Sequence, residues 1–356
     1  MTDFLVERGG GPPYPVRVGR DLAAGLAWLR EAAGPATRIA LVCDERVAGL
    51  YAAAVEDRWP EARRFTVPPG EDSKSPERLV EAWRFLRDRG CDRSSLVLAL
   101  GGGVVGDLAG FAAATYMRGI RIAHLPTSLL AMADSALGGK TAINLGAKNL
   151  VGAFHAPVAV LCHLPFLASL PPREVRCGLG EVWKTGVLRG EPLWSLLEAK
   201  ASRLRALDLD ALEPVVRACL EHKARVVARD EREAGERALL NFGHTLGHAL
   251  ELLDPGLSHG EAVAVGGAFA LELAQRLGRL EPTAAERLLA CARALGLPSR
   301  PTRPVDPEAA WELLLRDKKA RGGTLRWVLP RGLGELDLVD DVPAERAREL
   351  LAGFLC

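Results

Sequence analysis

The sequence predicts an α/β plus α protein, with a Rossmann-like parallel-sheet domain followed by a mainly helical domain. Short apolar runs alternate with amphipathic segments up to about residue 165, and helical periodicity is nearly continuous after it. A glycine-rich run that directly follows one apolar segment is typical of the strand-to-helix turn of a nucleotide-binding sheet. The chain of 356 residues is long enough for two domains, which we place at 1–165 and 166–356.

The elements of the two domains follow from these patterns. Four apolar runs predict buried parallel strands, at residues 38–43, 95–100, 120–125 and 158–162, with an amphipathic helix at 76–89. Helices are predicted in the second domain at residues 174–189, 194–207, 212–233, 239–253, 261–277 and 284–295, and a strand at 324–329. The proline-rich segment 163–172 is the expected hinge, and we expect the active site in a cleft between the domains.

Composition excludes several classes of protein. The formal net charge is +1 and the chain has no apolar run long enough for a membrane helix, so neither nucleic acid nor a membrane is an expected partner. No secretory leader is visible, and the seven scattered cysteines form no CxxC pair, which favours a cytoplasmic location. Only eight of the 46 basic residues are lysines, so the position of each lysine is informative.

The glycine run at 101–107 predicts a dinucleotide site. Gly101, Gly103 and Gly106 fit the pattern G-x-G-x-x-G, although a tight turn without a ligand remains an alternative. The usual fingerprint also has an acid at the end of the following strand, and residues 125–128 contain none. Asp44, at the end of an earlier strand, is the candidate ribose ligand. A P-loop at 135–141 fails because Asp134 stands where its first glycine is required.

A histidine cluster predicts a metal site. His244 and His248 are four residues apart on one helix, His259 follows, and each of the three has a glycine neighbour. Imidazoles with one carboxylate are typical of a catalytic zinc site that keeps an open position. Glu181 has the most glycine-rich setting among the candidate carboxylates, but spacing alone does not choose it over Glu174 or Glu221.

Taken together, these motifs resemble the 3-dehydroquinate synthase family over nearly the whole chain. The resemblance is carried by residues 69–74, 101–107, 115–119, 126–134, 138–141, 148–149, 181–184, 241–248 and 259–261. One difference is visible, because the segment 140–148 is one residue shorter than the usual family loop.

The resemblance implies specific ligands. It implies zinc, or cobalt, held by Glu181, His244 and His259, with His248 in the substrate pocket rather than on the metal. It implies NAD held by Asp44, Glu71, Lys74, Gly102, Gly103, Val104, Val105, Gly106, Asp107, Thr127, Ser128, Lys140 and Lys148. It implies a catalytic and substrate pocket formed by His248, Lys140, Lys184, Arg118, Asp134, Asn241, Lys223, Arg237, Lys148, Asn149 and one lysine of the pair 318–319, which we take as Lys318.

The implied activity is that of a carbon–oxygen lyase acting on a phosphate ester. The family's substrate, 3-deoxy-D-arabino-heptulosonate 7-phosphate, is transiently oxidised by NAD, loses phosphate, is reduced again, opens its ring and closes by an aldol step to 3-dehydroquinate. The resemblance also implies a homodimer, an NAD-binding first domain and a metal- and substrate-binding second domain. The alternatives are a sister sugar-phosphate cyclase with another substrate and a metal-dependent glycerol or alcohol dehydrogenase.

Overall fold

The computed structural model describes residues 2–233, 235–320 and 325–356. The chain forms two compact units, one of residues up to 170 together with 223–232, and one of residues 171–222 and 233–356. Helix α8 (Leu209–Arg229) is divided between them, so that Lys223 belongs to the first unit. The division at 165/166 and the roles assigned to the two domains remain predictions.

A parallel sheet organises the first unit. Within the described residues seven strands follow the order β1-β2-β9-β6-β5-β3-β4, and every neighbouring pair except β1–β2 is parallel. The bounds are β1 (Thr2–Val6), β2 (Tyr14–Gly19), β3 (Ile39–Asp44), β4 (Arg63–Val67), β5 (Leu96–Gly101), β6 (Arg121–Pro126) and β9 (Ala159–His163). The predicted parallel sheet is confirmed. Strand β4 was missed because it lies at the edge and carries the polar run Arg63, Arg64 and Thr66.

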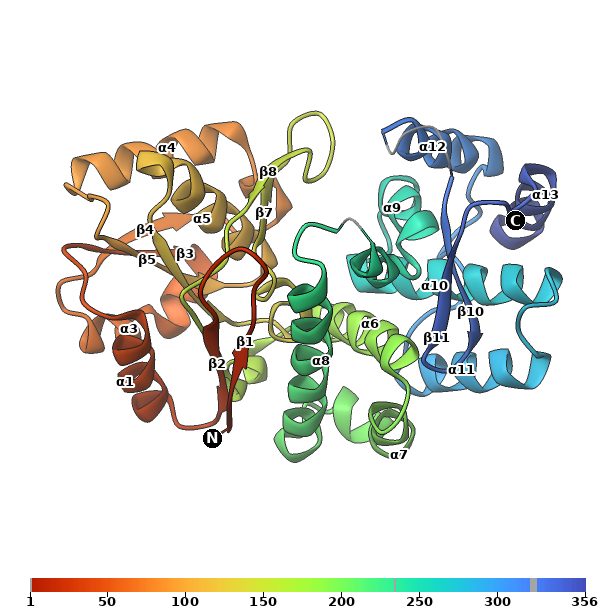
Figure 1. The fold of residues 1–356 in the computed structure, drawn as a ribbon, viewed down its shortest axis with the longest axis horizontal. Helices are drawn as coiled ribbons and strands as arrows, with labels where there is room; N and C mark the ends of the chain where they lie inside the picture. Colours follow the sequence, from red (N-terminus) through yellow and green to blue (C-terminus); the bar gives the residue numbers. More distant parts are fainter. Residues whose placement is uncertain (1, 234, 321–324) are drawn as a thin grey trace. The chain divides into compact units, whose positions relative to one another are not determined.

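Helices cover both faces of this sheet (Figure 1). On one face lie α4 (Pro76–Asp88) and α5 (Gly103–Thr115), and on the other α1 (Leu22–Ala33) and α3 (Ala53–Arg58). Val42 and Val97 pack with Val105 and Ala109 of α5 in a buried core. The shorter elements are α2 (Glu45–Val47), η1 (Ala48–Ala52), η2 (Glu71–Ser73), η3 (Tyr116–Arg118), η4 (Ala131–Ser135), η5 (Leu164–Ser169) and the hairpin of β7 (Lys140–Ile143) and β8 (Val151–Phe154).

The second unit is mainly helical, as predicted, and α10 (His259–Arg276) is its central helix. Most of α10 is buried, and it packs against α6 (Pro172–Arg189), α9 (His244–Leu253) and β10 (Trp327–Gly332). The remaining elements are α7 (Leu193–Arg205), η6 (Glu236–Asn241), α11 (Pro282–Ala294), α12 (Pro307–Ala320), β11 (Glu335–Val339) and α13 (Ala344–Leu355).

One predicted helix is broken in the structure. The segment predicted as a helix over 239–253 begins as η6 and resumes as α9, and Gly243 between them has a φ of +79°. A Cβ at Gly243 would lie 2.4 Å from the carbonyl oxygen of Val263, so both its conformation and its packing require glycine. The break places His244 in the first turn of α9. The predicted strand 324–329 starts at Trp327, and residue 324 lies outside the described part.

Glycines allow α6 and α10 to approach each other closely. A Cβ on Gly260 would lie 1.8 Å from the carbonyl oxygen of Cys177, and one on Gly180 would lie 2.1 Å from that of Gly260. Both distances are far shorter than any van der Waals contact, so neither position accepts a side chain without separating the helices. This contact sets the spacing between Glu181 on α6 and His259 on α10.

All seven cysteines are free, and six of them are buried. Within the described residues no helix is both long and apolar enough to cross a bilayer.

The first prediction tests the glycine contact. Gly260→Ala should lower the free energy of unfolding by about 3 kcal/mol, the cost of strong overpacking. Gly353→Ala is the matched control, because nothing lies within 4 Å of a Cβ at that helical position. This control should raise the stability by about 0.5–1 kcal/mol, as alanine is the better helix former. Urea unfolding measures both, and equal stabilities of the two variants would contradict the prediction.

The second prediction concerns pH. Burial lowers the pKa of His124 on β6 from 6.5 to about 4, so the folded state keeps this imidazole neutral. Its contribution to stability is therefore complete above pH 6.5 and is lost as the pH falls towards 4, by up to about 3 kcal/mol. Urea unfolding of the wild type and of His124→Leu between pH 4.5 and 8 should show the wild type losing more stability on acidification. If the free energies of unfolding of the two proteins changed equally with pH, His124 would have no part in the acid sensitivity.

Candidate functional site

The carboxyl ends of β3 and β5 form the switch point of the sheet in the first unit. The chain passes from β3 to β4 on one side and returns to β5 on the other. Ligands of open α/β sheets bind at such a point. Cys43 pairs with Leu100, so Asp44 and Gly101 lie level at the ends of neighbouring strands. Asp44 precedes the glycine loop in the sequence, whereas the acid of the usual fingerprint follows it. In the structure Asp44 nevertheless lies at the end of the strand next to the loop, where that acid is normally found.

The glycine loop turns directly from β5 into α5. Gly102 precedes the first helical residue Gly103, and no side chain caps this end of the helix. The amide of Thr127 donates a hydrogen bond of 2.9 Å to the carbonyl oxygen of Gly101, which ties the loop to the end of β6. Because the first amides of a helix lack partners within the helix, this end can bind a phosphate. Ser128, the next predicted cofactor residue, accepts a hydrogen bond from the amide of Ala131.

Lys74 joins the glycine-loop helix to the loop after β7. Its side chain is buried, and its Nζ lies 2.7 Å from Oδ2 of Asp107, 3.5 Å from Oε1 of Glu71 and in hydrogen-bond contact with Oδ1 of Asn149. Burial raises the pKa of Asp107, and the charge of Lys74 opposes that shift. The structure thus brings together four predicted site residues. Glu71, Lys74 and Asp107 were assigned to NAD, and Asn149 to the substrate pocket.

Asn144 is part of the same network and was not predicted. Its Oδ1 accepts a 2.8 Å hydrogen bond from the amide of Asn149, and its Nδ2 donates a 3.0 Å bond to Oε1 of Glu71. Its amide donates to the carbonyl oxygen of Lys74 at 2.7 Å. Asn149 has a φ of +54°, a conformation that asparagine tolerates better than most residues. No sequence motif marked Asn144, because its role depends on contacts between two segments that are distant along the chain, 71–74 and 144–149.

The other predicted site residues of the first unit do not form a single cluster. Nζ of Lys223 lies 2.9 Å from Oδ1 of Asp134 and 2.8 Å from its carbonyl oxygen, so these two predicted residues are paired. Arg118, Lys140 and Lys148 are exposed, and Arg118 has a φ of +65°. A hollow in this unit is lined by glycine-loop residues, Asp107, His124 and Lys140.

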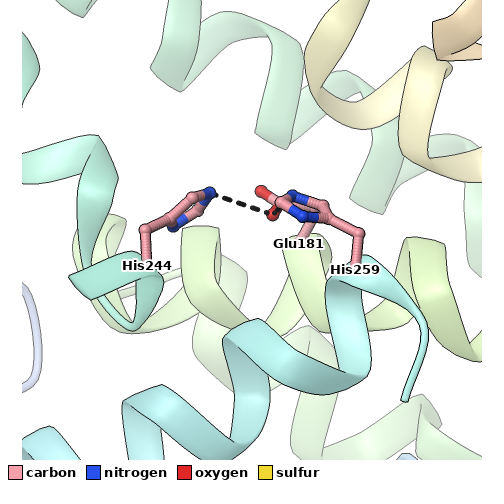
Figure 2. Close-up of side chains that lie close together, drawn as sticks. All are labelled: Glu181, His244 and His259. Atoms are coloured by element: carbon pink, nitrogen blue, oxygen red, sulfur yellow. Dashed lines mark ion pairs between the residues drawn. The ribbon is translucent and has the colours of Figure 1, made fainter. Parts of the chain in front are cut away.

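A carboxylate and two imidazoles converge in the second unit (Figure 2). Glu181 comes from the middle of α6, His244 from the start of α9 and His259 from the start of α10. Nε2 of His244 lies 3.6 Å, and Nε2 of His259 3.3 Å, from Oε1 of Glu181. Ligand atoms of a tetrahedral zinc site with bonds of about 2.0–2.1 Å are about 3.3 Å apart, so the observed spacings match such a site.

The bonding of Glu181 also fits a metal ligand. Its side chain is 1 % exposed, and neither oxygen has a hydrogen bond of ordinary geometry within the described residues. A buried carboxylate in this state is costly unless cations face it. The alternatives left open by the sequence lie elsewhere, since Glu174 is exposed and Glu221 pairs with Arg217 and Arg189.

The charges around Glu181 determine its ionisation. Burial alone would raise the pKa of Glu181, but Lys184, whose Nζ lies 2.5 Å from Oε2, and the two histidines hold it well below the usual value. Burial and the charge of Lys184 lower the pKa of His244, which favours its neutral form. Burial alone would lower the pKa of His259, but the neighbouring carboxylates of Glu181 and Glu251 raise it to about 9.

Each of the two clustered imidazoles has a partner on its other nitrogen. Nδ1 of His244 donates a 3.2 Å hydrogen bond to the carbonyl oxygen of Phe242, and Nδ1 of His259 donates to Oε1 of Glu251. Glu251 was not predicted, although its position seven residues after His244 on an apolar helix is a signal that could have found it. The exposed ring of His248 lies 5.2 Å from that of His244, beside the cluster.

Three further predicted residues belong to the second unit. Nδ2 of Asn241 donates a 2.6 Å hydrogen bond to Oε1 of Glu233, another residue that the sequence did not indicate. Arg237 is 1 % exposed, which is exceptional for an arginine. The side chain of Lys318 lies outside the described part of the structure, and so does that of Lys319.

Comparison with known families settles the relationship of the chain. The model described as "3-dehydroquinate synthase N-terminal" matches residues 64–177, and the one described as "3-dehydroquinate synthase C-terminal" matches residues 178–320. The chain belongs to the 3-dehydroquinate synthase family. The resemblance found in the sequence is thereby confirmed.

Members of the 3-dehydroquinate synthase family are similar to this chain over nearly its whole length. The synthase of Cereibacter sphaeroides strain ATCC 17029 is 44% identical, over 97% of this chain and 96% of its own. That of Paracoccus denitrificans is 43% identical over 96% of both chains. That of Halorhodospira halophila is 46% identical over 89% of this chain and 90% of its own.

Solved structures show the same fold. A 2-deoxy-scyllo-inosose synthase complexed with carbaglucose-6-phosphate, NAD+ and Co2+ matches with a TM-score of 0.91 and 25% identity, over 99% of this chain and 100% of its own. A 2-epi-5-epi-valiolone synthase from Streptomyces hygroscopicus with NAD+ and Zn2+ matches with a TM-score of 0.86 and 29% identity, over 98% of both. A probable glycerol dehydrogenase from Sinorhizobium meliloti, with a TM-score of 0.65 and 18% identity over 95% of both chains, shares the fold alone.

The third prediction concerns Lys184. The larger, planar guanidinium of Lys184→Arg cannot replace a compact ammonium packed at 2.5 Å from Glu181, so the variant should lose about 1–3 kcal/mol of stability and most of its activity. Lys200→Arg on α7 is the control, because Lys200 is only partly buried and has no predicted role. Urea unfolding and steady-state kinetics check both. Wild-type kinetics in Lys184→Arg would remove Lys184 from the active site.

Proposed function

We propose that this chain converts 3-deoxy-D-arabino-heptulosonate 7-phosphate into 3-dehydroquinate and phosphate, with NAD as a catalyst that is regenerated in each turnover. The observation that carries the proposal is the Glu181–His244–His259 cluster, with ligand atoms at tetrahedral spacing, in a member of this family. The reaction involves no net oxidation, so the fold must hold both an oxidising cofactor and a site for elimination.

The proposed NAD site is the switch point of the sheet. Asp44 would accept hydrogen bonds from a ribose, and the glycine loop at the start of α5 would bind the pyrophosphate. This arrangement is supported by the strand order and by the NAD+ in the two solved cyclases. The remaining proposed cofactor residues are Glu71, Lys74, Asp107, Thr127, Ser128, Lys140 and Lys148.

The proposed metal is Zn2+ or Co2+, the ions named with the two solved cyclases. When bound, such an ion acts as a Lewis acid on the oxygen of the alcohol that is oxidised. The two imidazoles would bind it through Nε2 and Glu181 through its carboxylate, and Lys184 balances the charge of that carboxylate. Ligands from three separate helices fix the geometry before any substrate arrives.

The proposed substrate carries a carboxylate and a phosphate, and the cations predicted for the pocket suit these two anions. They are Arg118, Lys140, Lys148, Lys184, Lys223, Arg237 and Lys318. His248 would move a proton from the hydroxyl that is oxidised, and Asp134, Asn149 and Asn241 would orient the sugar hydroxyls. We also propose that the enzyme is cytoplasmic and that it is a homodimer. Light scattering of the purified protein tests the dimer.

The fourth prediction tests the activity itself. The purified protein should release phosphate from 3-deoxy-D-arabino-heptulosonate 7-phosphate but not from glucose 6-phosphate or sedoheptulose 7-phosphate. A chelator should abolish release, Zn2+ or Co2+ should restore it, and NADH should not accumulate because its hydride returns to the substrate. Release from glucose 6-phosphate would instead indicate a sister cyclase, and stoichiometric NADH with a simple polyol would indicate a dehydrogenase.

The fifth prediction tests the metal ligands. His259→Ala should lose the bound metal and nearly all activity, because it removes one of the three proposed ligands, while keeping its fold, because the side chain lies at the start of α10 and is already 25 % exposed. Metal analysis, circular dichroism and the phosphate-release assay measure the three quantities. Normal turnover of the metal-free variant would refute this role for His259.

A further inference from the structure

We propose that Glu251 is a positioning residue that fixes the tautomer and the orientation of His259 for metal binding. The proposal rests on the metal site proposed above. Oε1 of Glu251 accepts the hydrogen bond from Nδ1 of His259, and Nε2 of the same ring faces Oε1 of Glu181 at 3.3 Å. One imidazole is thus held between two carboxylates, of which Glu181 alone belongs to the metal cluster.

The contact of Glu251 selects one tautomer of His259. A carboxylate accepts a hydrogen bond, so the proton of a neutral imidazole must lie on Nδ1 and the lone pair on Nε2. That lone pair then points to the place where the Nε2 atom of His244 and the carboxylate of Glu181 also converge. In the other tautomer the Nε2 proton would point there instead and prevent coordination.

The two clustered imidazoles are oriented by partners of different charge. His244 uses the neutral carbonyl oxygen of Phe242, whereas His259 uses a carboxylate. A carboxylate partner also increases the electron density on the ligand, and loss of such a partner typically weakens metal binding by about 10- to 100-fold. We therefore assign to Glu251 the larger orienting effect of the two.

The fold holds Glu251 in place. It lies seven residues, or about two helical turns, after His244, so both side chains are on the same face of α9. Its side chain is 12 % exposed. The end of the helix is fixed by Asp254, whose carboxylate accepts hydrogen bonds of 2.7 Å from the amide and 2.6 Å from the hydroxyl of Thr302.

The test compares Glu251→Gln with Glu272→Gln. The first variant keeps the shape but replaces a group that only accepts hydrogen bonds by a carboxamide that can also donate one to Nδ1, so it removes both the tautomer selection and the charge next to His259. The second variant removes a charge from α10 at a carboxylate that pairs with Arg276 and Arg300. Zinc affinity of the folded, full-length proteins is measured by competition with a chromophoric chelator. Glu251→Gln should bind zinc about 10- to 100-fold more weakly and Glu272→Gln like the wild type. Wild-type affinity in Glu251→Gln would overturn the proposal.

A double-mutant cycle separates positioning from a general structural effect. The cycle uses the residual zinc affinity of His259→Ala, measured at raised zinc concentrations. If Glu251 acts through His259, Glu251→Gln should not weaken this residual affinity further, whereas an equal loss in both backgrounds overturns the proposal. If circular dichroism shows Glu251→Gln unfolded, Glu251→Asp takes its place, because a shorter carboxylate keeps the charge and withdraws the acceptor. Failure of the proposed metal site can be told apart from failure of the Glu251 proposal. If the metal site is wrong, the wild type and Glu181→Gln will bind zinc equally weakly.

Discussion

The close approach of α6 and α10 is the constraint on which the proposed metal site depends. Gly180 and Gly260 leave no room for a Cβ, so the two backbones are in direct contact just where Glu181 and His259 leave them. Gly243 likewise allows the start of α9, where His244 lies, to contact the backbone of α10 at Val263. Separating these helices by the width of one methyl group would move ligand atoms that are now 3.3 Å and 3.6 Å apart beyond reach of a common ion.

The same packing has an electrostatic consequence. It buries a carboxylate that would otherwise be strongly destabilising, and the structure compensates with Lys184 and two imidazoles close to it. Glu251 adds a second negative charge behind His259. A divalent cation suits such a group, because Glu181 and Glu251 supply negative charge around it while Lys184 stays paired with Glu181.

In the first unit the order of the strands brings the proposed cofactor residues together. Asp44 and the glycine loop are more than fifty residues apart in the sequence, but β3 and β5 are neighbours in register. Lys74, between Asp107, Glu71 and Asn149, then joins the loops that surround this edge of the sheet. The order of Asp44 and the glycine loop along the chain differs from the standard fingerprint, but their arrangement in the sheet does not. A ribose ligand needs only to lie at the end of the strand next to the glycine loop.

The sequence by itself determined the parallel sheet, the mainly helical second part, the glycine loop and the histidine cluster, because each is a local pattern of apolar spacing or residue type. It did not reveal the edge strand β4, whose exposed residues carry no apolar signal, or the break at Gly243. Spacing alone did not choose Glu181 over Glu174 and Glu221; the family resemblance implied it and the tertiary structure brought it to the two histidines. Only the tertiary structure revealed Glu251, Asn144 and Glu233. Glu181 and Asn144 contact residues far away along the chain, whereas Glu251 and Glu233 contact residues only eight positions away. All four contacts depend on how the chain packs, and no periodic pattern of residue types marks them.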